Sequence, residues 1–189
     1  FAQHIGRALS QAGVQIEVTE PSPPFLSEDE AAHFGFGLYS CRYGNIYTPR
    51  QMVQLLAEAL NDSAPETPIW RKKRRYFDAL RPNIEPDGLE SEREVRLHRA
   101  EHLAAIRTML GQITTFIFTL GMTESWCDLA SGRTLPLCPG VIAGEYSAES
   151  TAFQNFRYPE ILADLAAIRS LLHQVNPAIR LLLTVSPVP

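Results

Sequence analysis

The sequence predicts an α/β fold, in which helices cover a parallel sheet of about four or five strands. Two runs, 114–120 and 179–185, are apolar and rich in β-branched residues without polar alternation, which is typical of strands buried on both faces. A long helical pattern precedes each run, and this alternation of helix and strand indicates parallel strands. Ligands bind at the carboxyl ends of the strands in such sheets, so we expect a functional site there.

The composition is that of one ordinary globular domain. The chain has 189 residues, of which 45% are hydrophobic, and 17 basic against 21 acidic residues give a net charge of −4. This charge provides no bulk attraction to nucleic acid, and no run reaches the roughly 20 apolar residues that span a bilayer. The few cysteines lack zinc-type spacing, so we expect neither a disulfide framework nor a metal or other cofactor, and a reduced compartment such as the cytoplasm fits them better: Cys41, Cys127 and Cys138.

The first third of the chain predicts two helices and one strand. Apolar residues at helical spacing predict a helix over 3–12, with Gly13 as its C-cap. Val14–Val18 alternates apolar and polar residues and predicts a short strand. A proline-rich loop follows, after which Ser27 is expected to cap a brief helix with acidic residues in its first turn.

Two longer helices are expected in the middle of the chain. Thr48, followed directly by proline, is a typical N-cap and predicts a helix over 49–60. Residues 61–90 are polar and contain several prolines, which indicates an irregular excursion. The helical pattern returns over 90–110, and Gly111 is expected to close that helix.

The last third predicts a loop, a helix and a strand. Glycine and proline recur over 127–150, which indicates a looped insertion with room for a small hairpin. A strong helical pattern then ends before Pro177, and the second buried run follows it. The chain opens on phenylalanine and closes on Ser-Pro-Val-Pro, so we expect residues 1–189 to be a single domain fragment, truncated at both ends.

Three segments end a strand or loop in small and polar residues, and we expect them to converge on one edge of the sheet: Arg42–Thr48, Gly121–Trp126 and Thr184–Pro189. Within the first, Gly44 removes a Cβ just before a helix, which would leave backbone N–H groups able to hold an oxyanion. The alternative is a tight turn that needs a positive φ.

The second segment carries the polar cluster with the most chemical potential. Thr123 and Glu124 could orient a nucleophile or donate to a developing oxyanion, or they could cap a following helical turn. Trp126 could be a platform for a substrate or a cover for the core. The sequence leaves both alternatives open.

Other charged groups have simpler interpretations. His98 and His102 share a helix face at a spacing that can bind zinc, but no third ligand is evident, so we expect a solvated face. The basic run 71–75 could contact a phosphate or an acidic polymer, and an exposed basic patch is the favoured interpretation. The remaining histidines do not suit the role of a catalytic base: His4, His33 and His173.

Several distinctive strings indicate a resemblance to the GSCFA family, a group related to SGNH-type hydrolases and acyltransferases. They cover most of the chain and read FAQHIGRAL, YGNIYTPRQMVQLL, FTLGMTESW, LCPG with GEY, NFRYPEILADL and NPAIRLLLTVSPVP. The resemblance implies a three-layer, flavodoxin-like fold of the SGNH type, with helices on both faces of the parallel sheet. It also implies a serine nucleophile that precedes Phe1 and an Asp–His pair that follows Pro189, so residues 1–189 alone should be inactive.

The resemblance further implies an oxyanion site. Gly44 matches the glycine whose N–H joins the oxyanion hole, and Thr123 stands where the family pattern G-x-N-D has asparagine. A threonine hydroxyl can still donate one hydrogen bond, although its reach differs. Glu124 completes the catalytic set that we expect, and the pocket is expected to be lined by Asn45, Tyr47, Trp126, Ser186 and Pro187.

These expectations give one leading function and one alternative. The leading function is a serine acyl hydrolase or O-acyltransferase that acts on a small-molecule or carbohydrate ester. The alternative is a non-catalytic module that binds a glycan or a nucleotide on the same scaffold, which the threonine at position 123 favours.

Overall fold

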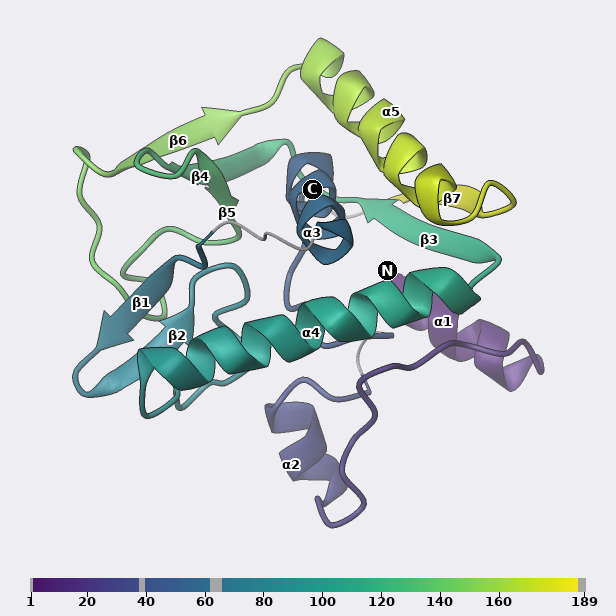
Figure 1. Cartoon of the computed structure of the whole chain (residues 1–189), viewed down its shortest axis with the longest axis horizontal. Helices are drawn as coiled ribbons and strands as arrows, with labels where there is room; N and C mark the ends of the chain where they lie inside the picture. The colour runs from purple at the N-terminus through teal and green to yellow at the C-terminus, as the bar shows by residue number, and fades with distance from the viewer. Residues whose placement is uncertain (1, 38–39, 62–65, 187–189) are drawn as a thin grey trace.

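A computed structural model describes residues 2–37, 40–61 and 66–186, and it is a mixed α/β structure with a small parallel sheet (Figure 1). The helices are α1 (Ala2–Gln11), α2 (Glu28–His33), α3 (Pro49–Leu60), α4 (Glu92–Gln112) and α5 (Tyr158–Val175). The strands are β1 (Ile69–Lys72), β2 (Arg75–Asp78), β3 (Thr115–Leu120), β4 (Glu124–Asp128), β5 (Arg133–Leu135), β6 (Thr151–Asn155) and β7 (Arg180–Val185).

The two buried runs form the parallel sheet, as expected. β3 pairs with β7 over its whole length, from Thr115 opposite Arg180 to Leu120 opposite Val185, and α5 connects back to the second strand. Over the described residues this sheet has two strands, fewer than the four or five that we expected. A further strand was expected at Val14–Val18, and that segment pairs with no strand of the described chain.

The main core lies between this sheet and three helices. Phe116 and Phe118 point from β3 into it, and side chains from α3, α4 and α5 complete the cluster. Its largest fully buried side chains are Leu56, Ile106, Leu110, Ile168 and Leu172. The helical periodicity that predicted these three helices is therefore the pattern of their buried face.

The strand prediction at Val14–Val18 was wrong because alternation alone does not create a pairing partner. The segment is extended, and Val14 and Val18 remain 47% and 44% exposed. Gly13 does end α1 with a φ of +83°, and its N–H donates to the Ser10 carbonyl, so the predicted C-cap is confirmed. Ser27 caps α2 through a complete capping box, as expected.

The helix predicted over 49–60 is confirmed together with its cap. The Thr48 side chain accepts a hydrogen bond from the Gln51 N–H at 3.3 Å, and the Gln51 side chain accepts one from the Thr48 N–H at 3.1 Å. Pro49 occupies the first turn, where its missing N–H costs no hydrogen bond. The prediction that Gly111 closes α4 was wrong, because the helix runs through Gly111 to Gln112.

The excursion over 61–90 is more regular than predicted. It contains an antiparallel hairpin of β1 and β2, in which Trp70 faces Phe77. Both rings are buried in a second core cluster with Leu135. The basic run lies at the tip of this hairpin, mostly exposed as expected, and Lys73 in the turn has a φ of +56°.

A three-stranded antiparallel sheet, in the order β5-β4-β6, follows directly on β3 (Figure 1). The small hairpin expected in 127–150 is present, but its first strand starts earlier, at Glu124. Thr123 and Glu124 therefore lead into a strand, and the interpretation that they cap a helical turn was wrong. None of the helices in the described part of the chain is long and apolar enough to cross a bilayer.

Candidate functional site

Three predicted segments meet at the carboxyl end of the parallel sheet. The Met122 N–H, just after β3, donates to the Tyr47 carbonyl at 3.0 Å. Gly121 lies so close to this turn that an added Cβ would be 3.3 Å from the Tyr47 oxygen. The Ser186 N–H, just after β7, donates to the Leu120 carbonyl at 2.9 Å. We call this meeting point of residues 44–47, 121–124 and 186 the rim.

Gly44 adopts the tight-turn conformation that was one of its two interpretations. Its φ is +73°, and an added Cβ would lie 3.1 Å from Arg81 Cβ and 3.3 Å from Arg81 Cα. Both the backbone conformation and the close approach of Arg81 therefore require glycine at this position. A role of the Gly44 N–H in holding an oxyanion stays a prediction.

Thr123 and Glu124 are exposed at the rim beside a residue that the sequence analysis did not single out. The Thr123 hydroxyl donates to Asn155 Oδ1 at 2.8 Å, and the Phe156 N–H donates to the Thr123 carbonyl at 2.8 Å. Glu124 lies opposite Asn155 in the β4–β6 ladder. The end of β6 therefore contributes to the rim alongside the segment after β3.

The other predicted pocket residues lie on or next to the same turn. The Tyr47 N–H donates to Gln51 Oε1 at 2.9 Å, and the Gln51 amide donates to the Asn45 carbonyl at 3.4 Å. These bonds tie the turn to the first helical turn of α3. Phe1 and Pro187 lie outside the described residues.

Trp126 lies on β4 within a group of aromatic rings. Its ring makes edge-to-face contacts with Tyr146 at a centroid distance of 5.8 Å and with Phe153 at 5.7 Å. It also packs against the second core cluster, so one part of the ring covers the core, which was one of its two interpretations. Tyr146 and Phe153 are 54% and 56% exposed.

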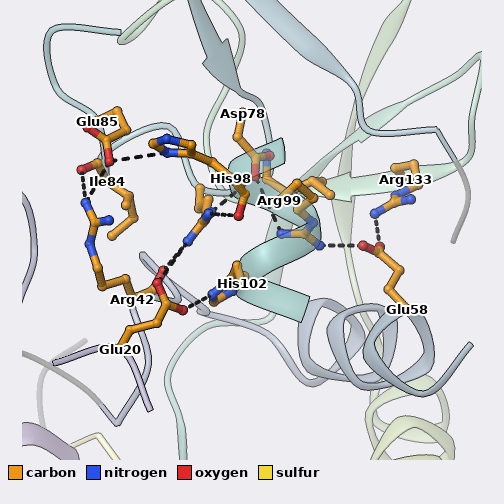
Figure 2. A network of polar contacts seen from close by, with 12 residues as sticks. Glu20, Arg42, Glu58, Asp78, Ile84, Glu85, His98, Arg99, His102 and Arg133 are labelled. Carbon is orange, nitrogen blue, oxygen red and sulfur yellow. Dashed lines mark hydrogen bonds and ion pairs between the residues drawn. The ribbon is translucent and has the colours of Figure 1, made fainter. Parts of the chain in front are cut away.

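Figure 2 shows a network of buried charged side chains. Glu58 of α3 forms ion pairs with both Arg99 and Arg133, and all three side chains are almost completely buried. Asp78 of the hairpin pairs with Arg81 at 3.3 Å and with Arg99 at 3.6 Å. The network joins α3, α4, β5 and the hairpin, and Arg81 is also the residue against which Gly44 packs.

Arg42 is the first residue of the predicted segment Arg42–Thr48, and it has a structural role. It is buried, and its guanidinium donates to the Phe34 carbonyl at 2.7 Å and to Glu85 Oε1 at 2.8 Å. Glu85 also lies 3.7 Å from His98 Nδ1 (Figure 2). These bonds fix the chain that leads into the turn at Gly44.

His102 is buried, so the expectation of a solvated face was wrong for this residue. Its Nδ1 lies 2.5 Å from Glu20 Oε1, and its side chain is inaccessible to solvent. Burial, together with the charge of Arg81, lowers the pKa of His102 to about 4, so the ring is neutral at neutral pH and its Nδ1–H donates to Glu20. Glu20 comes from the proline-rich loop, and this distant partner is why the helix pattern could not reveal the burial.

The described residues contain no group of three or more histidine, cysteine or acidic side chains that could hold a metal ion. The cysteines that the sequence analysis noted are all free thiols. Burial raises the pKa of the Cys41 thiol, which lies 2.7 Å from the Thr19 hydroxyl. A reactive cysteine is accessible to solvent and has a lowered pKa, whereas this thiol is fully buried and its pKa is raised.

The rim defines a class of protein: an α/β protein with a candidate ligand site at the carboxyl end of parallel strands. Comparison with known families is more specific. The chain belongs to the GSCFA family, whose family model matches residues 1–189. No curated protein and no solved structure matches the chain.

Proposed function

We propose that this protein is a serine acyl hydrolase or O-acyltransferase of the SGNH type that acts on carbohydrate esters. The observation that carries the proposal is the rim, where the hydrogen bond from Met122 to Tyr47 joins two segments far apart in the sequence. A glycine turn, a polar strand end and the end of the neighbouring strand are the parts from which an acyl-transfer site is built.

The proposed reaction follows the serine pathway. The family's serine, supplied by sequence outside residues 1–189, attacks the ester carbonyl and its proton passes to a histidine. The Gly44 N–H and the Thr123 hydroxyl stabilise the oxyanion, and Glu124 lies beside it. The sugar alcohol then leaves with the proton. Either water or a second sugar hydroxyl attacks the acyl-enzyme and gives its proton to the histidine, the bond between the acyl group and the serine breaks, and the histidine returns the proton to the serine. Residues 1–189 without that serine and histidine are inactive under this proposal.

The complete domain is proposed to be a three-layer, flavodoxin-like sandwich. Two observations support this. The face of β3 opposite the main core carries half-buried side chains, and α1 is in contact with this strand. Leu182 and Val185 of β7 are 47% and 70% exposed, although a parallel strand is normally covered on both faces. Further strands and helices would bury this apolar surface.

One observation favours the alternative, a non-catalytic module that binds a glycan or a nucleotide. The Thr123 hydroxyl already donates its single hydrogen to Asn155. A hydroxyl engaged in this way has no second hydrogen for an oxyanion. Catalysis therefore requires that Thr123 turns toward the oxyanion when the substrate binds, whereas binding alone does not.

Labelling with a fluorophosphonate probe tests the proposal. The protein is produced with the sequence that flanks residues 1–189, next to a variant that carries alanine in place of the family serine. We expect labelling of the first protein only. Thr123→Val, which removes the hydroxyl at constant volume, should slow labelling about 100-fold, and Thr123→Ser should retain the rate. Correctly folded protein that is not labelled would contradict the hydrolase proposal and favour the binding module.

A further inference from the structure

An exposed strip runs from the rim along one face of β4 and β6. In the ladder between these strands, Glu124 lies opposite Asn155, and Trp126 lies opposite Phe153. Residues that face each other in an antiparallel ladder point to the same side of the sheet, and the next pair on that side is about 7 Å further along. The strip therefore begins with a polar pair at the rim and continues with an aromatic pair.

The aromatic part of the strip presents ring surface to solvent. Phe153 is 56% exposed, and Tyr146 approaches Trp126 from the loop before β6 and is 54% exposed. The edge-to-face contacts of Trp126 with both rings hold the three side chains in fixed relative orientations. Because Trp126 also packs against the second core cluster, the core holds this group of three rings in place.

We propose that this strip binds a pyranose ring of the substrate next to the rim, with the exposed rings of Phe153 and Tyr146 against the sugar and the half-buried Trp126 holding both rings in place. The inference rests on the proposed function and specifies where its carbohydrate is held. The C–H bonds of a sugar face carry small positive charges, which the negative faces of aromatic rings attract. The Glu124 carboxylate accepts hydrogen bonds from sugar hydroxyls, and the Asn155 amide both donates and accepts them.

The arrangement of polar and apolar groups favours a sugar over a protein partner. The aromatic pair is bounded on the ladder by the exposed Glu124 and Asn155 on one side, and by the half-buried Asp128 and the buried Thr151 on the other. A protein interface has an apolar core of much larger area, from which charged side chains are depleted. A single sugar ring, about 5 Å across, fits within a strip that alternates in this way at intervals of about 7 Å.

Tryptophan fluorescence can test the strip on the chain as it is, without catalysis. The sequence has two tryptophans, and Trp70 is buried, so a Trp70→Phe variant makes Trp126 the reporter. Titration with cellotetraose, xylotetraose and tetra-N-acetylchitotetraose should give a saturable change in emission with at least one of them. Phe153→Ala and Tyr146→Ala should each weaken that binding about three- to tenfold.

The matched control is Phe25→Ala, which removes a ring that is 82% exposed in the N-terminal loop and should leave the binding unchanged. Circular dichroism shows whether each variant is folded. If Tyr146→Ala does not fold, Tyr146→Phe, which keeps the ring, takes its place. The inference is wrong if no oligosaccharide binds. It is also wrong if AMP, a nucleotide titrated in the same way, is the only compound that binds, or if Phe153→Ala abolishes self-association of the chain, which would make the strip a contact between two copies. If the oligosaccharide binds but the fluorophosphonate probe does not label the protein, only the hydrolase proposal is wrong. If the probe labels the protein but no oligosaccharide binds, only the proposal of a sugar-binding strip is wrong.

Discussion

Replacing Glu58 with glutamine should strongly destabilise the protein, because this carboxylate neutralises two buried arginines. The side chains of Glu58, Arg99 and Arg133 are only 5%, 5% and 6% exposed. Arg99 keeps a second carboxylate, Asp78, at 3.6 Å. Arg133 has no second carboxylate partner among the described residues. Its Nε and Nη1 atoms are buried and have no hydrogen-bond partner in the described part of the chain.

Removing one partner of a buried ion pair costs about 3–5 kcal/mol, because the other charge is left unpaired away from water. We therefore expect Glu58→Gln to lower the free energy of unfolding by about 3–5 kcal/mol, measured by urea denaturation. The same loss should lower Tm by roughly 6–20 °C. Arg133→Met in the Glu58→Gln background should recover part of the loss, since it removes the unpaired charge.

The matched control is Glu66→Gln, which removes an exposed carboxylate 2.9 Å from Arg96. Exposed pairs contribute less than about 1 kcal/mol, so this change should be nearly silent. If Glu58→Gln were as mild as Glu66→Gln, the network in Figure 2 would not be the element that holds α3, α4 and β5 together.

Three further changes test single features. Gly44→Ala should cost about 1–2 kcal/mol of unfolding free energy for its positive φ, plus a further loss from the close contact. Gly37→Ala, where φ is +70° but no atom of the described residues lies within 4 Å of an added Cβ, isolates the first contribution. Thr48→Ala should cost about 1 kcal/mol in urea denaturation, and an unchanged midpoint would contradict the capping role. The pKa of His102 is about 4 in the folded protein against an ordinary value of 6.5. As the pH falls, the unfolded chain therefore protonates this histidine before the folded protein does, and the free energy of unfolding should fall by about 3 kcal/mol between pH 6.5 and pH 4. Burial is the largest single influence on the pKa of Glu20 and raises it, but the His102 hydrogen bond and the nearby charges, Arg81 and Arg42 among them, together lower that pKa, so Glu20 adds a loss of the same sign at still lower pH. His102→Gln should flatten the upper part of this pH profile, and an unaltered profile would contradict the assignment.

The elements that the sequence predicted are those with strong local signals. The helix at 49–60 has its cap, its proline and its apolar face within the short run of residues 48–60. The hairpin of β1 and β2 was missed because each strand has only four residues, several of them basic. It is stabilised by the packing of Trp70 and Phe77 against Leu135, which is distant in the sequence. Val14–Val18 shows the opposite error, a local pattern without a partner.

The same distinction applies to the site. The convergence of the turn at Tyr47 with the segment at Met122 was predicted from strand ends that share one edge of a sheet, but this reason holds for Met122 alone. Met122 follows β3, whereas the turn at Tyr47 follows no strand of the described residues and leads into α3. The position of Asn155 was not predictable, because it meets Thr123 across 32 residues and only the β4–β6 ladder brings it there. The pair of Glu20 and His102 spans 82 residues, and neither residue carries a local signal of burial.

The most direct test of the account is the position of a covalent phosphonate adduct in a crystal structure of the longer protein that carries the family serine. The account predicts that the phosphonyl oxygen lies at the rim, about 2.7–3.1 Å from the Gly44 N–H or the Thr123 hydroxyl. The group that replaces the sugar should point along β4 toward Trp126. An adduct bound away from the turn at 44–47 and from Thr123 would contradict the claim that these segments form an acyl-transfer site.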